Sequence, residues 1–420
     1  MAERVPLPPS TSPSGELHSV EAALEALRDG IEPLASERLA LDAAAGRVLA
    51  AEVVARMDVP PFDASAMDGY AVHHGDAGTR LPVSQRIAAG DSTQPLRTDS
   101  CARLFTGSPI PEGADCVVMQ ERVERSVEKG AEHALMPAEL SAGDNIRRRG
   151  QDVAAGSLLL PAGTRLNAAA LGMLAAQGIA EVEARNRPRV ALLSTGDELV
   201  EPGQPLQSGQ IYNSNRPMLR ELLTGFGAEV VVTGSLPDSH DATREQLRQA
   251  AELADVIVTT GGVSVGEEDH VKAVIESLGT LDLWRLALRP GKPLALGRIA
   301  RADGTPCRVV GLPGNPVSSF VGAWLFLRPL LGALLGSPQM AALPEWPAIS
   351  AFATRTGPRR HYMRVRLTPS PEGLSAQAFP SQDSGVLSSC LAADALAVIP
   401  EHTRIEPGDR LTCLPLSNDF

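Results

Sequence analysis

The stretch Asp255-Val-Ile-Val-Thr-Thr-Gly-Gly-Val-Ser-Val-Gly-Glu-Glu-Asp269 decides the fold, because a buried strand runs into a glycine-rich turn and then into a helix. Its apolar run 256–258 is typical of a parallel strand covered on both faces. The glycines at 261, 262 and 266 allow positive φ and close approach of the backbone to a ligand. The helix is predicted to start near Glu268 or Asp269, with its free N–H groups facing whatever the glycine loop holds. The alternative is an ordinary tight turn between strand and helix.

A second segment, Cys307-Arg-Val-Val-Gly-Leu-Pro-Gly-Asn-Pro316, repeats this design. A short apolar strand leads into a rigid Gly/Pro turn, with Asn315 predicted as the N-cap and Pro316 at the first helical position. Two such units direct helix N-termini toward the carboxyl edge of a doubly wound sheet, where ligands of such folds bind.

Composition indicates a cytoplasmic multidomain protein. The 420 residues suggest about three domains, on the usual prior of ~150 residues each. The net charge of −12 with 3% aromatic residues opposes non-specific nucleic-acid binding. No apolar run approaches the ~20 residues of a membrane helix, and residues 1–15 lack the apolar core of a signal peptide. The five cysteines form no C-x-x-C pair, so we expect free thiols.

The fold class predicted is multidomain α/β plus β: a doubly wound, mostly parallel α/β domain, an inserted β-rich domain, a helical or mixed linking domain and a small β-barrel-like C-terminal domain. A helix after Ser19 and another over 168–177, capped by Asn167, are expected to pack together. The predicted boundaries are 1–15 for a disordered tail, 16–54 with 156–187 for a discontinuous linking domain, 55–155 for the insertion, 188–336 for the α/β domain and 343–420 for the C-terminal domain.

Seven motifs in order along the chain resemble one family, the bacterial MoeA-type molybdopterin molybdenumtransferases, which also includes the C-terminal domain of gephyrin. The match covers nearly everything after the tail. The motifs are PPFDASAMDGYAV at 60–72, TGSPIPEGA at 106–114, NIRRRGQD at 145–152, STGDEL at 194–199, the glycine loop 261–269, RPGKP at 289–293 and LPGNP at 312–316.

The resemblance implies an elongated homodimer whose cleft combines the molybdopterin-binding α/β domain of one subunit with the β-rich insertion at the subunit boundary. The implied reaction takes adenylylated molybdopterin and molybdate, hydrolyses the adenylate, releases AMP and leaves molybdenum on the pterin dithiolene, with Mg²⁺ assisting. Transient contacts with the adenylyltransferase and with downstream cofactor-handling proteins are implied as well.

Four candidate residues lie in the insertion. Asp68 stands in a Met-Asp-Gly-Tyr turn signal and matches the family's acidic position, and Thr106 matches its active-site threonine, bonding either substrate or Asp68. The arginine run that starts at Arg147 is by default a solvated face, but in an acidic protein it offers bidentate contacts to phosphate or molybdate oxygens. Asp152 either orients one of these guanidiniums or acts at the site itself.

Carboxylates after successive strands of the α/β domain converge on one sheet edge and are predicted to hold magnesium through oxygen ligands. We rank Asp269 first, Glu198 second and Asp238 third. The alternative for Asp269 is helix-start electrostatics of ~0.3–1 kcal/mol, and for Asp238 an N-cap.

Lys292 follows a Pro-Gly pair, which holds a compact ammonium on a short rigid loop, suited to a tetrahedral oxyanion; a plain surface lysine is the alternative. The resemblance makes this segment the molybdate site, with Arg364 and Ser384 as companions. The further substrate-binding positions that it implies are Gly261, Gly262, Ser264, Arg285, Arg289, Pro293, Pro313 and Pro316.

Three features depart from the family pattern. Arg285 and Arg289 stand where lysine is frequent, Pro237 precedes Asp238 where a basic residue is common, and His270 replaces an aromatic residue. Two other functions stay open: a molybdopterin-binding scaffold without turnover, and the adenylyltransferase that prepares the substrate. The candidate carboxylates named above argue against a scaffold without turnover. An adenylyltransferase would not explain the presence of residues 55–155.

Overall fold

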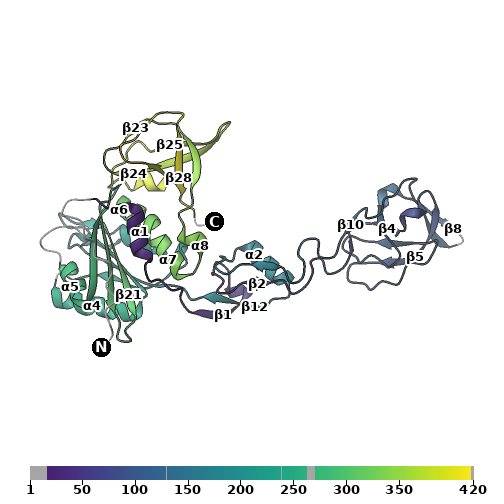
Figure 1. The fold of residues 1–420 in the computed structure, drawn as a ribbon, viewed down its shortest axis with the longest axis horizontal. Coiled ribbons are helices and arrows are strands. Elements are labelled where there is room, and N and C mark those ends of the chain that lie inside the picture. Colours follow the sequence, from purple (N-terminus) through teal and green to yellow (C-terminus); the bar gives the residue numbers. More distant parts are fainter. Residues whose placement is uncertain (1–16, 129, 238, 263–269, 418–420) are drawn as a thin grey trace.

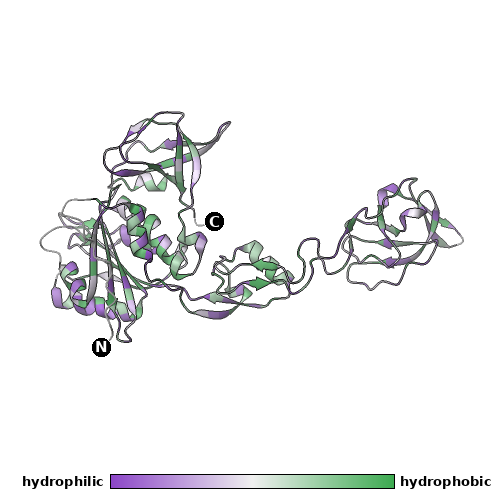
Figure 2. Cartoon of the chain, in the orientation of Figure 1, coloured by the Kyte–Doolittle hydropathy of each residue, from purple (hydrophilic) through white to green (hydrophobic). Residues whose placement is uncertain are grey.

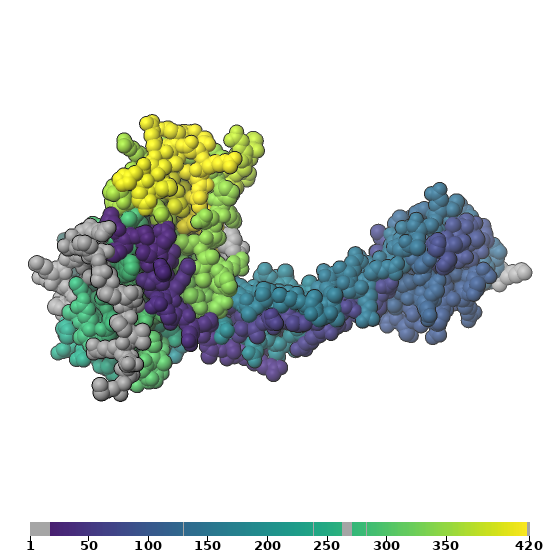
Figure 3. Space-filling view, in the orientation of Figure 1, coloured from purple at the N-terminus to yellow at the C-terminus, as the bar shows by residue number. Residues whose placement is uncertain are grey.

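The computed structural model describes residues 17–128, 130–237, 239–262 and 270–417. The molecule is elongated: an α/β domain carries the C-terminal β domain on one side, and an arm leads from it to a separate β-rich outer domain (Figure 1). In the space-filling view the outer domain stands clear of the main body and is joined to it by the arm (Figure 3).

The α/β domain is built on a six-stranded sheet of order β16-β13-β17-β21-β20-β18. The first four strands pair in parallel, and β20 pairs antiparallel with its neighbours β21 and β18, so the predicted mostly parallel sheet is confirmed. The strands are β13 (Arg189–Ser194), β16 (Glu229–Ser235), β17 (Val256–Thr260), β18 (Gly279–Arg285), β20 (Pro293–Ala300) and β21 (Pro306–Leu312).

Helices cover both faces of this sheet, which explains the unbroken apolar run in β17. Val256 and Val258 join one core with helix α3 (Asn215–Gly225), whereas Ile257 joins a second core with α4 (His240–Leu253) and α5 (His270–Leu278). Successive strand residues point to opposite faces, so a strand with helices on both sides must be apolar throughout.

A long apolar helix runs through Pro316–Leu334, formed by α6 (Pro316–Gly322), the π-helical segment η4 (Ala323–Leu327) and α7 (Arg328–Leu334). Its length and composition would allow it to cross a membrane, but 83% of it is buried inside the protein. The hydropathy colouring shows apolar residues gathered on these helices beside the sheet (Figure 2). It is therefore the central core helix of the α/β domain.

The first helix does not pack where the sequence predicts. Ser19 caps α1 (Val20–Arg28) as expected, but the helix joins the core of the α/β domain, and Arg308 of β21 donates to the Leu27 and Asp29 carbonyls at its end. Helix α2 (Ala168–Ala176), capped by Asn167, belongs to a different core in the arm. The expected packing of these two helices on each other is wrong, because α1 covers the apolar surface beside the sheet instead.

The arm consists of paired strands that carry the chain out and back, which confirms an insertion within the linking region. Antiparallel pairs join β1 (Ser36–Ala40) to β12 (Glu181–Arg185) and β2 (Val53–Val54) to β11 (Leu158–Leu160). The outer domain beyond them has a sheet of order β7-β4-β6-β5-β9-β8 and a β3-β10 pair. Its strands are β3 (Ala64–Ser65), β4 (Gly69–Val72), β5 (Arg80–Ile87), β6 (Cys101–Leu104), β7 (Cys116–Met119), β8 (Glu124–Glu128), β9 (Ala131–Leu135) and β10 (Ile146–Arg147).

The C-terminal domain is a small closed barrel, because β24 pairs with both β25 and β26 and completes the ring β24-β25-β22-β28-β26. The short β19 (Leu288–Arg289) of the α/β domain pairs with β24 and ties the two domains together. The segment between the two predicted domains contains helix α8 (Pro338–Ala341). The barrel elements are β22 (Trp346–Ser350), β24 (Arg360–Ser370), β25 (Gly373–Ala378), β26 (Ala395–Ile399) and β28 (Arg410–Pro415), with β23 (Thr354–Arg355), β27 (Arg404–Ile405) and α9 (Ser388–Leu391) beside them.

Candidate active site

A cleft of about 670 Å³ opens at the carboxyl edge of the sheet. Strands β13, β17 and β21 lead into it at Thr195, Gly261 and Pro313. Their turns are tied together, since the Thr195 N–H donates to the Thr260 carbonyl at 3.0 Å and the Gly261 N–H to the Leu312 carbonyl at 3.1 Å. The predicted convergence of these strand ends on one sheet edge is thus confirmed.

The two glycines after β17 are required by a neighbouring turn. Gly261 has φ of 81° and Gly262 of 63°, and a Cβ built on Gly261 would lie 2.5 Å from the Thr195 hydroxyl oxygen. The sequence predicts that the backbone of these glycines approaches a ligand closely. In the structure the close neighbour of this backbone is Thr195. Among the described residues, the buried Thr260 hydroxyl has no hydrogen-bond partner, and Thr260 lines the cleft.

Most of the candidate residues assigned to the α/β domain line this cleft. Those that do are Glu198, Gly261, Gly262, Lys292, Pro293, Pro313, Pro316 and, from the C-terminal domain, Ser384. Ser264, Asp238 and Asp269 lie outside the described residues. Sequence reasoning missed Thr195, Asn215 and Ser318, which also line the cleft. Thr195 stands inside a quoted motif, whereas Asn215 and Ser318 begin helices and carry no chemical signature of their own.

Lys292 forms the basic wall of the cleft. It is half-buried and is the one cationic side chain among the described residues that line the space. Its loop is closed by a hydrogen bond from the Leu286 N–H to the Lys292 carbonyl at 2.8 Å. Gly291 has φ of 86° and would bring a Cβ to 3.2 Å from Ser318 on α6. The ammonium is consequently carried on a loop that rests against the first turn of that helix.

Asn315 connects the cleft to the C-terminal domain. It precedes α6 in an extended conformation, but its side chain accepts no capping hydrogen bond; its Nδ2 instead donates to the Ser384 hydroxyl at 3.3 Å. The Val317 N–H donates to the Ser384 carbonyl at 3.2 Å. The predicted side-chain cap is wrong, because the orphan N–H of the helix finds a backbone partner in the barrel.

Arg364 lies behind the cleft wall. It is fully buried, with Nη2 donating to the Asp383 carbonyl at 3.0 Å and Nε to the Ser389 hydroxyl at 3.0 Å. It therefore holds the segment next to Ser384, while its Nη1 has no partner among the described residues.

More positive charge surrounds Arg364. Burial, together with repulsion from Arg289, Arg364 and Arg359, lowers the pKa of His361 to about 4. Arg289 pairs in register with His361, and Arg285 pairs with Pro293. Both arginines are exposed and flank the Lys292 loop, outside the residues that line the cleft.

In the outer domain, Asp68 and Thr106 form a pair. Asp68 directly precedes β4, and its Oδ1 accepts both the Thr106 N–H and the Thr106 hydroxyl at 2.8 Å. These two hydrogen bonds, with the nearby charge of Arg103, lower the pKa of the Asp68 carboxyl. The predicted Asp68–Thr106 hydrogen bond is confirmed, within one domain.

The arginine run divides into structural and free members. Arg148 pairs with Asp63 at 2.6 Å and Arg149 with Asp58 at 2.5 Å, so these two guanidiniums have carboxylate partners other than Asp152. Arg147 is exposed in β10 and makes no ion pair within the described part of the chain. Because β10 pairs with β3, which leads to Asp68, Arg147 belongs to the same region of the outer domain.

The candidate residues thus form two groups within one chain. The cleft group lies at the edge of the α/β sheet, and the Asp68 group lies beyond the arm, next to β4 (Figure 1). Fold and cleft define a multidomain α/β protein with a cleft at the carboxyl edge of its parallel strands, the edge at which proteins of this fold class bind their ligands.

Three family profiles match the chain: "MoeA N-terminal region (domain I and II)" at residues 18–178, "Probable molybdopterin binding domain" at 191–333 and "MoeA C-terminal region (domain IV)" at 348–416. A molybdopterin molybdenumtransferase of Haemophilus influenzae is 36% identical over 92% of this chain and 95% of its own length. One of a Nostoc species is 39% identical over 72% of this chain and 70% of its own length. The crystal structure of the molybdopterin biosynthesis moeA protein from Pyrococcus horikoshii OT3 superposes with a TM-score of 0.77 at 28% identity, covering 95% of this chain and 99% of that one.

The chain belongs to the MoeA family of molybdopterin molybdenumtransferases. It is a transferase of molybdenum cofactor biosynthesis that acts on molybdopterin.

Proposed function

We propose that the enzyme takes adenylylated molybdopterin and molybdate, hydrolyses the adenylate with magnesium, releases AMP and leaves molybdenum on the pterin dithiolene. The observation that carries this proposal is the composition of one cleft, which is lined by Lys292, Glu198 and the glycine turn at 261–262. An anion and a hydrated cation can occupy such a space together.

Different residues of the cleft bind different parts of the two substrates, according to charge. The N-terminus of the Pro316–Leu334 helix directs its positive dipole end to phosphate oxygens, whereas the Gly261 and Val317 N–H groups are already bonded within the protein. Lys292 offers a compact positive charge to molybdate, and Ser384 adds a hydroxyl from the barrel. Arg364 positions Ser384 through the Asp383 carbonyl, which fixes the far side of the oxyanion site.

Magnesium fits the oxygen donors of the cleft. Glu198 is exposed there, and Thr260, whose buried hydroxyl has no partner among the described residues, lines the same cleft; hard oxygen ligands are what Mg²⁺ prefers. When bound, the ion would polarise the phosphoanhydride and neutralise the leaving AMP. Asp269 and Asp238 stay predicted ligands on sequence grounds.

Purified protein incubated with adenylylated molybdopterin, magnesium and molybdate tests the proposed reaction. We expect AMP release together with active cofactor, because one site holds both substrates. Binding of the pterin nucleotide without AMP release would identify a scaffold. Formation of the adenylylated compound from ATP and molybdopterin would instead identify an adenylyltransferase.

Replacing Glu198 by Gln should raise the magnesium concentration for half-maximal AMP release by about tenfold or more, the loss typical of a disturbed metal site. The change keeps the volume and removes the charge. A magnesium titration of Glu198→Gln beside Glu221→Gln, an exposed carboxylate on α3, measures the effect. Equal magnesium curves for both variants would remove Glu198 from the metal site.

We further propose a homodimer in which the outer domain of one subunit completes the cleft of the other. The separation of Asp68 from Lys292 within one chain supports this (Figure 1). Apolar side chains exposed along the arm and outer domain support it too, since such a surface favours association. They are Val54, Met57, Phe62, Met67 and Leu158.

One chain has a mass of 44.1 kDa. Light scattering at micromolar concentration should therefore give twice that mass. A variant carrying Phe62→Glu and Leu158→Glu places charges on the proposed interface and should shift the mass toward one chain. A wild-type mass of one chain would contradict the dimer.

A cytoplasmic location agrees with the five cysteines, all of which are free and buried. The adenylylated substrate requires a preceding adenylyltransferase, and the product is a cofactor that other proteins use, so the proposal includes transient contacts with the adenylyltransferase and with downstream cofactor-handling proteins.

A further inference from the structure

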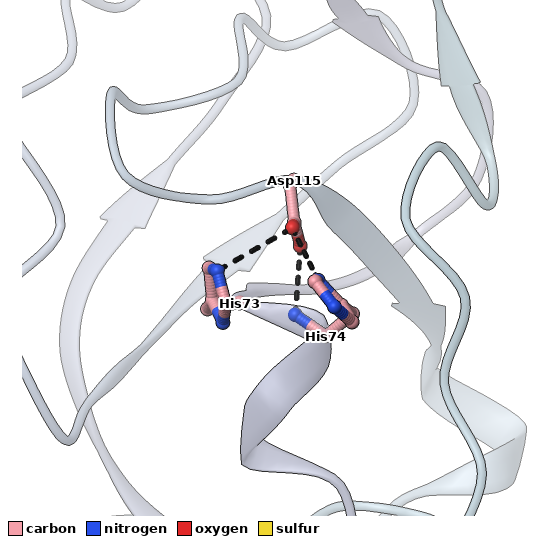
Figure 4. A group of neighbouring side chains, drawn as sticks. All are labelled: His73, His74 and Asp115. Atoms are coloured by element: carbon pink, nitrogen blue, oxygen red, sulfur yellow. Dashed lines mark hydrogen bonds and ion pairs between the residues drawn. The ribbon is translucent and has the colours of Figure 1, made fainter.

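Two adjacent histidines and an aspartate meet at one end of the outer sheet (Figure 4). His73 and His74 follow β4, and Asp115 precedes β7. One ligand atom from each of the three lies within 4.8 Å of the others. The His74 Nδ1 is 2.5 Å from Asp115 Oδ2, and the His73 Nε2 is 3.6 Å from the same oxygen.

The backbone fixes this arrangement before any ligand binds. Val72 pairs in register with Cys116 across β4 and β7, and the Asp115 N–H donates to the Val72 carbonyl at 3.1 Å. The other carboxylate oxygen of Asp115 accepts the His74 backbone N–H at 2.7 Å. The carboxylate is thereby held with Oδ2 directed between the two imidazoles.

We propose that His73, His74 and Asp115 bind one divalent transition-metal ion of the zinc class. Two imidazole nitrogens and a carboxylate oxygen match the ligand preference of Zn²⁺, and of Ni²⁺ or Cu²⁺, whereas Mg²⁺ prefers oxygen alone. Zn–N and Zn–O distances of about 2.0–2.2 Å require the histidines to move apart from hydrogen-bonding contact with Asp115. Both are about half exposed, so they have room to turn, and solvent can supply the remaining ligand.

The three ligands are not equivalent. The His73 Nδ1 accepts the Gly75 N–H at 3.1 Å, so a neutral ring has its proton on Nε2, the nitrogen that faces Asp115. Binding a metal through Nε2 moves that proton to Nδ1 and breaks the bond to Gly75. Binding through His74 Nδ1 moves the proton that this nitrogen shares with Asp115 to Nε2 and breaks no hydrogen bond to the backbone. His74 and Asp115 are therefore the stronger ligands and His73 the weaker one.

The site is separate from the proposed reaction. Asp68 and Thr106 lie at the Gly69 end of β4, whereas the histidines follow Val72 at the other end. A metal there would link the segment after β4 to the start of β7 and stabilise that end of the outer sheet. Failure of this proposal would leave the magnesium-dependent reaction of the cleft untouched.

Calorimetric titration of the full chain with Zn²⁺ tests the proposal. We expect one Zn²⁺ ion per chain to bind at these residues. His74→Ala and Asp115→Ala should each weaken the affinity for this ion by more than about tenfold, because removal of a residue that only supports a metal ligand already costs about tenfold. His73→Ala should weaken it less. His133→Ala, on β9 of the same domain, is the matched control and should bind like the wild type. Magnesium-dependent AMP release should be unchanged in all four variants.

Cobalt substitution gives a second readout. Co²⁺ bound by imidazole and carboxylate in a tetrahedral site should give visible absorption that Asp115→Ala loses while its circular dichroism stays that of the wild type. The proposal is overturned if no stoichiometric Zn²⁺ binds, or if His74→Ala and Asp115→Ala bind it as tightly as His133→Ala, which would place the ion elsewhere.

Discussion

Lys292→Ala raises the molybdate concentration for half-maximal insertion by about ten- to a hundredfold, because it removes one charge-assisted hydrogen bond worth on the order of 1.5–3 kcal/mol. Affinity for adenylylated molybdopterin should change little, since we propose that the phosphate oxygens bind at the start of α6 and not at Lys292. The measurement is a molybdate titration beside a pterin-nucleotide titration on the same protein.

Two variants sharpen this result. Lys292→Arg should recover only part of the molybdate affinity, because a planar fork cannot take the position of an ammonium on a loop resting against Ser318. Lys272→Ala, on α5 outside the cleft lining, should behave like the wild type. If only the nucleotide curve moves in Lys292→Ala, the residue belongs to the phosphate site.

At a molybdate concentration near the wild-type half-maximal value, where we expect each homodimer to be nearly inactive, a dimer that pairs an Asp68→Asn chain with a Lys292→Ala chain should keep about half of the wild-type turnover. In a composite site the unaltered outer domain of one chain meets the unaltered cleft of the other. One of the two sites is then intact and the second carries both changes. Co-expression with two different tags and sequential purification isolates this dimer for the AMP-release assay.

The reciprocal pairing gives the opposite expectation. With both substitutions on one chain and a wild-type partner, each composite site contains one altered half, so the dimer should be nearly inactive. If each site were instead built within a single chain, this dimer would keep about half of the turnover and the first pairing would lose it. The two pairings contain the same set of residues, so differences in folding cannot imitate the outcome.

The local elements of the α/β domain could be predicted because their signals are local. The apolar run at 256–258 requires helices on both faces, and the structure supplies them. Ser19 and Asn167 cap helices as expected, because a capping side chain reaches only to an N–H three residues ahead. The same strand-turn-helix logic brought Glu198, Lys292 and Pro313 to one cleft.

Contacts between distant residues were decided by the tertiary structure. Sequence pattern gives α1 an apolar face but does not say which surface covers it, and it packs beside the α/β sheet rather than on α2. Asn315 has the residue type of an N-cap, but its side chain donates a hydrogen bond to the Ser384 hydroxyl of the barrel instead. Asp58 and Asp63, about ninety residues away in sequence, are the partners of Arg149 and Arg148.

The sequence by itself determined the order of strands, glycine turns and helices, the residues that line the cleft edge and the family to which they belong, since periodicity, capping and turn chemistry act over a few residues. Only the tertiary structure placed Asp68 and Thr106 at the far end of an arm from Lys292. That distance depends on how paired strands such as β1 and β12 carry the chain outward, a long-range geometry that no local pattern encodes.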